Sequence, residues 1–421
     1  MEKENFRKNN QIGITLIALV VTIVILLILT GVTINMLLGE NGIIRTAQEA
    51  KNTWEGAVAN EQQEIENLVN ELNSSMNNEN GTGGETPENP EVPDGWDLSK
   101  VTPVPSEDTP PVNVPVPKGF TLSTVDGEKT VEDGFVIKQD GSNNEFVWIP
   151  VNETNFNAMY TEVKTAVALV GETGVTTSIY SKLRYKTSST TPGTTSGGRE
   201  PDLVVGNGSE FDASLSYCTL VGGASSPQKF AQDMVNEYQE IHDSVEQYGG
   251  FYIGRYELTG TTTSPTVVKG GTVITNTNWY HLKAACMKIV NNEGKQESEI
   301  IAKTTMMYGN QWDEVCNWLS GAGYDIEDST SWGNYRNNTE EGHGGKQTAG
   351  YKESWQANHI YDFAGNCREW TQEGEGTKYR VIRGGDCDNS GSDGPASFRS
   401  GYNPSYDGNS LFSTRSTLYI M

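Results

Sequence analysis

The feature that most constrains this chain is an uncharged, apolar run near its N-terminus. From Ile12 to Leu38 no residue is charged, and most positions are isoleucine, leucine or valine. Such a run is long enough to cross a hydrocarbon core as a helix. Lys3, Arg7 and Lys8 precede it, which favours a cytoplasmic N-terminus and export of everything downstream. The sequence therefore predicts a protein tethered to the cell membrane, with its C-terminal domain outside the cell.

The start of the apolar run resembles the leader of type IV prepilins. The stretch Gln11-Ile12-Gly13-Ile14-Thr15-Leu16-Ile17-Ala18 contains the glycine after which the prepilin peptidase cuts. The resemblance implies a leader over residues 1–13, cleavage between Gly13 and Ile14, and a pilin-like transmembrane helix over 14–38. It departs at Ala18, where pilins usually have a glutamate that aligns subunits, so pilus-like self-assembly stays an open alternative. Without cleavage, the segment is a signal anchor.

Two segments of different composition follow the membrane helix. Residues 39–75 repeat apolar side chains at steps of three and four, which predicts an amphipathic helix that extends the membrane helix outward. Residues 76–118 are rich in Pro, Gly, Asn, Glu and Thr. Such a composition cannot bury a core and favours extended geometry, so it predicts a proline-rich linker.

Charge and cysteine content exclude several classes of function. The formal net charge is -25, which argues against a nucleic-acid partner because phosphate binding needs a basic surface. The cysteines lack the CxxC spacing of zinc sites and are too sparse for a disulfide framework. They are Cys218, Cys286, Cys316, Cys367 and Cys387. No histidine pair with metal-ligand spacing is present either, so no metal site is predicted.

After Gly119 the chain changes to short strand-like runs separated by Gly, Asn, Ser and Thr. Strands are predicted at 146–151 and 251–257 from their aromatic and β-branched residues. Apolar periodicity predicts helices at 230–245, 279–290 and 311–319. Few helices and many irregular connections indicate an α+β fold, in which long loops usually have a functional role.

Five motifs in this region resemble, in order, those of the formylglycine-generating-enzyme (sulfatase-modifying-factor) family: FVWIPV, GGFYIGRYELT, NWYHLKAACMKI, IYDFAGNCREWTQE and YRVIRGGD. The resemblance covers residues 119–421, with an atypical insertion over 152–248, and implies a C-type-lectin-like domain with many irregular loops. We interpret the central motif residues as scaffold rather than as ligand contacts. They are Gly365, Asn366, Glu369, Trp370, Arg383, Gly384 and Gly385.

The enzymes of this family need two copper-binding thiols a few residues beyond the Arg-Gly-Gly motif, because a soft thiolate pair holds Cu(I). Here that stretch contains only Cys387, adjacent to the motif and outside the family's first thiol position. One thiol cannot make a two-thiolate site, so the sequence predicts a protein without enzymatic activity. A formylglycine-generating oxidase acting on a cysteine-containing peptide is the alternative.

The C-terminal tail has an unusual composition. From Gly384 to Ile420 it contains no Lys, Glu, Gln, Met or Trp, the five amino acids that no pyrimidine-ending codon encodes. The segment, about 384–415, thus resembles the variable region of diversity-generating-retroelement target proteins, whose template adenines are mutagenised. The framework Pro395-Ala-Ser-x-Arg399 followed by Pro404 fits that pattern. A turn-rich loop would explain the enrichment in Gly, Ser, Asn and Asp, but not the missing residues.

Chemically, the tail suits a binding face, since Tyr and Phe supply rigid contact area and Ser, Asn and Asp supply adaptable hydrogen bonds. The predicted function is a surface-displayed receptor or adhesin that binds an extracellular protein or surface glycan, and a minor pilin-like subunit is a further alternative. No cofactor is expected. A calcium site stays an open alternative because the acidic residues of the tail could be its ligands, although they do not have EF-hand spacing. The predicted ligand-binding residues are Asp386, Cys387, Asp388, Asp393, Phe398, Ser400, Tyr402, Asn403, Tyr406, Asp407 and Asn409.

Overall fold

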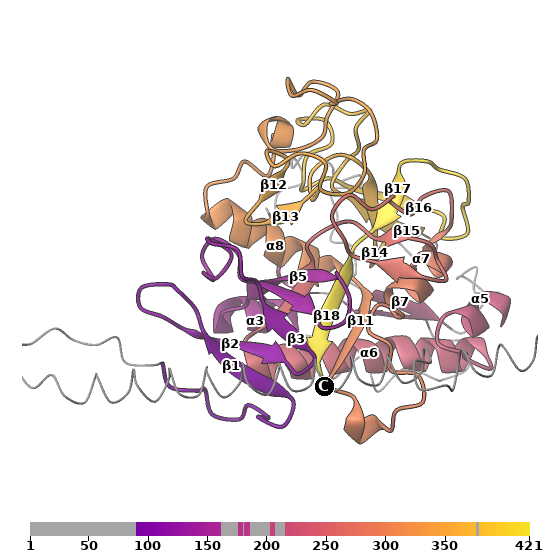
Figure 1. Ribbon diagram of the computed structural model, residues 1–421. Coiled ribbons are helices and arrows are strands. Elements are labelled where there is room, and N and C mark those ends of the chain that lie inside the picture. The colour runs from indigo at the N-terminus through magenta and orange to yellow at the C-terminus, as the bar shows by residue number, and fades with distance from the viewer. Residues whose placement is uncertain (1–89, 161–175, 180, 186–202, 207–214, 376–378) are drawn as a thin grey trace, which may run out of the picture. The chain divides into compact units, whose positions relative to one another are not determined.

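A six-stranded antiparallel sheet forms the centre of the fold (Figure 1). In the computed structural model, which describes residues 90–160, 176–179, 181–185, 203–206, 215–375 and 379–421, the chain is mixed α and β with more strands than helices. Across the sheet the strands are β11 (Ala302–Met306), β18 (Ser416–Ile420), β8 (Gly250–Gly254), β5 (Glu145–Pro150), β4 (Val136–Gln139) and β3 (Phe120–Leu122). The predicted strands at 146–151 and 251–257 are therefore confirmed as β5 and β8.

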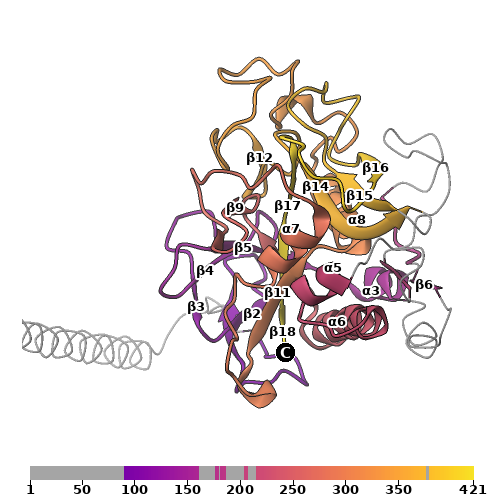
Figure 2. The same ribbon diagram turned by 90° about the vertical axis from the view of Figure 1, so that its right-hand side faces the viewer.

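A four-stranded sheet includes the strand directly before the compositionally biased tail and two strands within that tail. Its order is β16 (Arg399–Tyr402), β15 (Tyr379–Arg383), β14 (Arg368–Glu375) and β17 (Phe412–Thr414). β14 and β17 are parallel, and the other neighbours are antiparallel. The loops before and after β16 are thereby anchored at both ends by sheet hydrogen bonds. Both views place this sheet above the long helix α6 (Pro227–Tyr248) (Figures 1 and 2).

Helix α6 follows directly from its sequence. Ser226 caps its first turn by accepting a hydrogen bond from the Lys229 N–H, and Pro227 fits the first turn because its missing N–H has no helical partner there. Gly249 ends the helix in the left-handed conformation, with φ 76°. Buried residues recur at helical spacing along one face, which packs on the central sheet. They include Phe230, Met234, Tyr238, Ile241 and Val245.

The other predicted helices are also present. The prediction at 311–319 corresponds to α8 (Gly309–Gly321), and that at 279–290 corresponds to α7 (Trp279–Cys286), which is shorter because the chain turns after Met287. The remaining short helices are α3 (Glu153–Met159), α5 (Leu215–Leu220), η1 (Glu297–Glu299) and η2 (Ser329–Ser331). The remaining strands are β1 (Val101–Pro105), β2 (Asn113–Pro117), β6 (Thr176–Ile179), β7 (Leu203–Gly206), β9 (Thr259–Gly260), β10 (Pro265–Thr266), β12 (Gln356–Ala357) and β13 (Ile360–Tyr361).

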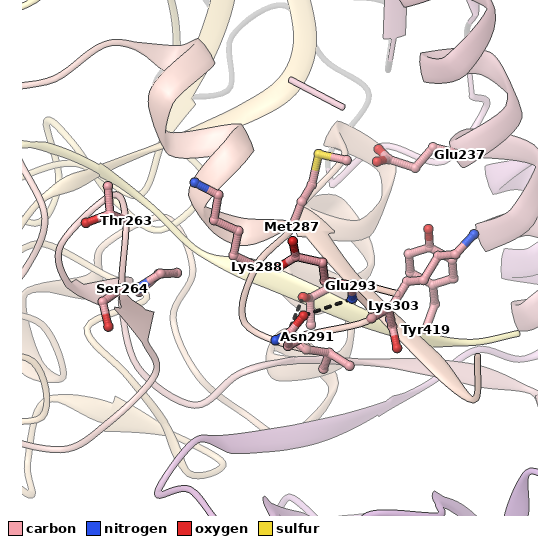
Figure 3. Close-up of a pocket in the computed structure, with 13 residues that line it drawn as sticks. Glu237, Thr263, Ser264, Met287, Lys288, Asn291, Glu293, Lys303 and Tyr419 are labelled. Atoms are coloured by element: carbon pink, nitrogen blue, oxygen red, sulfur yellow. Dashed lines mark hydrogen bonds between the residues drawn. The ribbon is translucent and has the colours of Figure 1, made fainter. Parts of the chain in front are cut away.

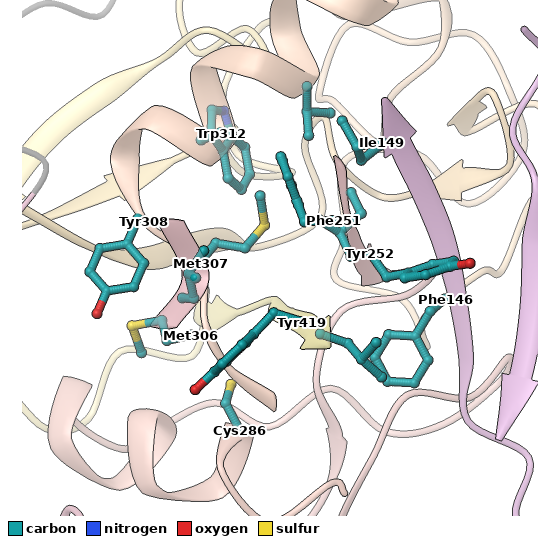
Figure 4. Close-up of a cluster of buried hydrophobic side chains, with 14 of the residues drawn as sticks. Phe146, Ile149, Phe251, Tyr252, Cys286, Met306, Met307, Tyr308, Trp312 and Tyr419 are labelled. Carbon is teal, nitrogen blue, oxygen red and sulfur yellow. The ribbon is translucent and has the colours of Figure 1, made fainter. Parts of the chain in front are cut away.

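Large side chains from the central sheet and helices share one core (Figure 4). Phe146, Phe251 and Tyr252 come from β5 and β8, and Trp312 comes from α8. All four are buried. Burial of each such side chain contributes about 2–3 kcal/mol, so this core is a main source of the stability of the body.

The proline-rich linker prediction for 76–118 is wrong over its last part. Val101–Pro105 pairs antiparallel with Asn113–Pro117 as the β1–β2 hairpin, and Val101, Val114 and Val116 are buried in the core. The register places Pro103 opposite Pro115. Alternate pairs in an antiparallel ladder exchange no hydrogen bonds, so proline at every second position leaves the ladder intact. The folded region therefore begins before Gly119.

The insertion over 152–248 contributes α3, α5, α6 and the β6–β7 pair within its described parts. The predicted leader at Gly13 and Ile14, the transmembrane helix, the amphipathic helix and the first part of the linker lie outside the described residues. Among the described helices, none combines the length and the apolar character needed to cross a membrane.

Candidate functional site

The tail rests on a buried ion pair between β14 and the residue that precedes β18. Glu369 accepts from Arg415 at 2.7 and 3.1 Å, and Arg415 also donates to the carbonyl oxygens of Gly254 and Tyr361, both at 2.8 Å. Trp370, the next residue, is fully buried. The scaffold interpretation of Glu369 and Trp370 agrees with this geometry, because neither side chain is accessible to a ligand.

Gly365 and Asn366 connect three loops below the tail. Gly365 has φ 78°, and a Cβ there would lie 2.3 Å from the carbonyl oxygen of Asn334, so only glycine fits. The Asn366 side-chain oxygen accepts from Asn334 at 3.0 Å and from the backbone N–H of Gln347 at 2.9 Å. Its amide donates to the buried carboxylate of Glu257. These contacts also place both residues in the scaffold.

Arg383 belongs to a buried cluster of charges, which we call the arginine cluster: Arg184, Arg383, Arg399, Asp313 and Glu373. Arg383 contacts Asp313 at 2.7 Å and Glu373 at 2.9 Å, and Arg399 contacts them at 2.8 and 2.6 Å. Arg184 contacts both carboxylates at 3.2 Å. Burial raises the pKa of Asp313, but the three guanidiniums outweigh it and hold that pKa at about 2. The cluster thus fixes β15 and β16 to helix α8.

Gly384 and Gly385 begin the tail where two backbone segments meet. Both have positive φ, 82° and 69°. A Cβ on Gly385 would lie 1.8 Å from the carbonyl oxygen of Gly394, which no rearrangement of a side chain could relieve. The first tail loop, residues 386–398, is therefore closed at its base by this glycine contact.

Asp386 and Cys387 do not belong to an exposed face, contrary to prediction. Only 4% of Asp386 and 1% of Cys387 are exposed. The Asp386 carboxylate pairs with the Arg368 guanidinium at 2.8 Å, and burial raises the pKa of the Cys387 thiol to about 12. Asp386 faces inward because Arg368 pairs with its carboxylate, and the backbone N–H of Cys387 donates to the carbonyl oxygen of Asn366 at 3.2 Å. No sequence periodicity signals this.

Arg368 is a residue of the site that the sequence did not reveal. Besides Asp386, its guanidinium donates to the side chain of Asn389 at 3.0 Å and lies over the rings of Phe398 and Phe412, at 5.1 and 5.9 Å. Its backbone N–H donates to the carbonyl oxygen of Leu411 at 2.8 Å. Arg368 therefore connects the first tail loop to the end of the second tail loop. The second tail loop covers residues 403–411.

The remaining predicted residues lie at or near the surface. Tyr402 and Tyr406 are 37% and 46% exposed although each is close to the buried ring of Phe412, at 4.9 and 6.4 Å between ring centroids. The two tyrosine rings are 6.2 Å apart. Aromatic rings that are held from below and open above offer rigid contact area. The exposed polar residues are Asp388 and Asp393 of the first loop and Asn403 and Asp407 of the second. The half-buried ones are Phe398, Ser400 and Asn409.

A polar hollow of about 450 Å³ adjoins the first tail loop. Its lining includes Asp328, Thr330 and Asn337. The Asn337 side chain accepts from the Gly391 N–H at 3.0 Å, and the Gly391 carbonyl accepts from the Ser329 N–H at 3.1 Å. No motif predicted it, because the hollow forms only when residues 325–340 fold beside the tail.

The cysteines and the possible metal ligands of the described region are not among the exposed residues of the tail. All five cysteines are buried, no disulfide joins any two of them, and burial raises the pKa of each thiol. Among the described side chains, one group of three has metal-ligand spacing: His242, Asp243 and Glu246 on α6. The acidic side chains of the tail do not converge in this way.

Comparison with known proteins identifies no family. No family model matches the chain, and no curated protein matches its sequence. Among solved structures it is similar to Treponema denticola variable protein 1, with a TM-score of 0.29 and 16% identity over 40% of this chain and 84% of that chain. A TM-score this low does not establish a shared fold.

Proposed function

We propose that this chain is a non-catalytic ligand-binding protein of the cell surface, with a C-type-lectin-like body and a binding face formed by the two tail loops and β16 between them. The observation that carries the proposal is the pair Tyr402 and Tyr406, exposed side by side above Phe412. Exposed short polar side chains on the same tail complete the composition typical of paratopes. The binding face, as proposed, consists of Asp388, Asp393, Phe398, Ser400, Tyr402, Asn403, Tyr406, Asp407 and Asn409.

The mode of binding that fits this face is contact by rigid aromatic rings surrounded by adaptable hydrogen bonds. The arginine cluster, the Glu369–Arg415 pair and Arg368 hold the backbone beneath it, so a change of exposed residues leaves the support unchanged. A face with this construction fits an extracellular protein or a surface glycan as ligand. Diversification of the tail by a retroelement, and display through the N-terminal apolar segment, belong to the same proposal.

The diversification part is tested in the genome. The DNA beside this gene should contain a reverse transcriptase and a second copy of the tail with adenines at the codons of the exposed residues. Sequencing the gene from many cells should show changes at those codons and conserved codons at Arg383, Gly385 and Arg399. The proposal fails if no second copy exists or if changes are spread evenly over the gene.

The binding part is tested by alanine substitution at Tyr402 and Tyr406. Both side chains are partly exposed, so the double variant should keep its melting temperature within a few degrees. Binding to intact surfaces of neighbouring cells should fall at least tenfold, since aromatic anchors dominate such interfaces. Substitution of Tyr351, an exposed tyrosine outside the tail, is the matched control. A large loss of stability would instead identify the pair as core.

A further inference from the structure

A hollow of about 610 Å³ lies between the β9–β10 hairpin, the end of α7, β11 and α6 (Figure 3). No residue of the two tail loops or of β16 lines it, so it is separate from the proposed binding face. Its volume is within the range of small-molecule sites, roughly 300–1,000 Å³. We call it the α7 pocket.

Two charged residues of the α7 pocket, Glu237 and Lys303, are already paired within the protein. The Glu237 carboxylate accepts from Lys283 at 2.8 Å, from Tyr308 at 2.7 Å and from Gln372 at 2.9 Å. Lys303 is likewise paired, with Glu240 and Glu297, both at 3.1 Å. These partners fix the wall of the pocket and leave few of its charged groups available to a ligand.

Two charged residues of the pocket are available, and they have opposite signs. Within the described part of the chain, neither Lys288 nor Glu293 forms an ion pair, with each other or with a third residue. The Lys288 ammonium has one long contact, 3.5 Å, to the carbonyl oxygen of Thr262. Glu293 uses only its backbone N–H, which donates to Asn291 at 2.9 Å. The half-buried apolar side chains of Met287, Val290 and Pro265 also line the pocket.

We propose that the α7 pocket binds a small zwitterion with an apolar body. Its carboxylate would pair with Lys288, its ammonium with Glu293, and its hydrocarbon part would contact Met287 and Val290. A free apolar amino acid and a short apolar peptide share this chemistry. The inference does not depend on the tail, and changes to Tyr402 or Tyr406 leave it untouched.

The test measures binding of three matched dipeptides to the full-length chain by calorimetry. Leu-Leu has both charges, N-acetyl-Leu-Leu lacks the ammonium, and Leu-Leu-amide lacks the carboxylate. Loss of one charge-assisted contact should weaken binding roughly tenfold or more, so Leu-Leu should bind most tightly. Free leucine is measured beside them, and its affinity relative to Leu-Leu distinguishes an amino-acid ligand from a peptide.

Two variants assign the contacts. The Lys288→Gln variant should bind Leu-Leu no more tightly than Leu-Leu-amide. The Glu293→Gln variant should bind Leu-Leu no more tightly than N-acetyl-Leu-Leu. Lys118→Gln and Glu132→Gln, which change exposed residues outside the pocket, are the controls and should bind like the unchanged protein. The proposal is overturned if the three dipeptides bind equally, if the controls weaken binding as much as the pocket variants, or if Leu-Leu at roughly 10 mM gives no signal.

Discussion

Two adjacent acidic residues of α8 respond to burial in opposite ways. Asp313 is surrounded by three guanidiniums, which outweigh burial and lower its pKa to about 2. Glu314 has no ion-pair partner among the described arginines, and both of its carboxylate oxygens accept from the side-chain amide of Asn155 at 2.9 Å. Burial is the largest influence there and raises the pKa of Glu314 to about 7.

Glu314→Gln should therefore change how stability depends on pH. In the unmodified protein Glu314 holds its proton up to about pH 7 when folded but releases it near 4.5 when unfolded. Its contribution to stability is thus complete below pH 4.5 and is lost as pH rises to 7, by up to about 3 kcal/mol. Urea unfolding from pH 4.5 to 8 should show this decline, and the glutamine variant, which keeps an acceptor for Asn155, should show less of it. An identical slope in both proteins would contradict the assignment.

Asp313→Asn should destabilise the fold strongly. The change leaves three guanidiniums against the single carboxylate of Glu373, and breaking a buried ion network costs roughly 3–5 kcal/mol. Urea unfolding at pH 7 measures the loss. Asp233→Asn, which removes a surface pair with Lys229 on α6, is the control and should cost less than about 1 kcal/mol. Equal losses would mean that the arginine cluster is not a principal support.

Among the structural elements, the two tail loops depend on one side chain of β14. Arg368 contacts Asp386 and Asn389 of the first loop and the ring of Phe412 at the start of β17. Arg368→Gln retains some hydrogen bonding but removes the charge. Relative to the unmodified protein, the variant should exchange amide hydrogens faster over residues 386–398 but not over β15. Its melting temperature should change little. Uniformly faster exchange would instead indicate a general loss of stability.

Sequence patterns predicted the elements that have a regular repeat and missed those that do not. Helix α6 was predicted because its apolar residues recur at helical spacing. The β1–β2 hairpin was missed because proline at alternate positions is typical of an extended linker, and only the pairing partner reveals a ladder. Composition alone also does not distinguish the exposed residues of the tail, such as Tyr402 and Tyr406, from its buried residues Asp386 and Cys387.

For the molecule as a whole, the described structure predicts which tail positions can vary. A library with randomised codons over 385–410, sorted for folded surface display, should accept many residues at Asp388, Asn403 and Asp407, which are exposed. It should retain glycine at 385 and 391, because a Cβ there would lie 1.8 and 2.3 Å from backbone atoms. Deep sequencing of the sorted cells gives the answer. Free variation at Gly385 would refute the loop closure described above.

The arginine cluster has a consequence for protein engineering. Arg184 comes from the 152–248 insertion, yet it shares Asp313 and Glu373 with Arg383 and Arg399, which flank the first tail loop. A shortened scaffold that omits the insertion would lose a cation from this balance and the helix that covers the central sheet. A scaffold for new binders should therefore keep the insertion and exchange only the two tail loops, as cassettes bounded by Gly385, Arg399 and Phe412.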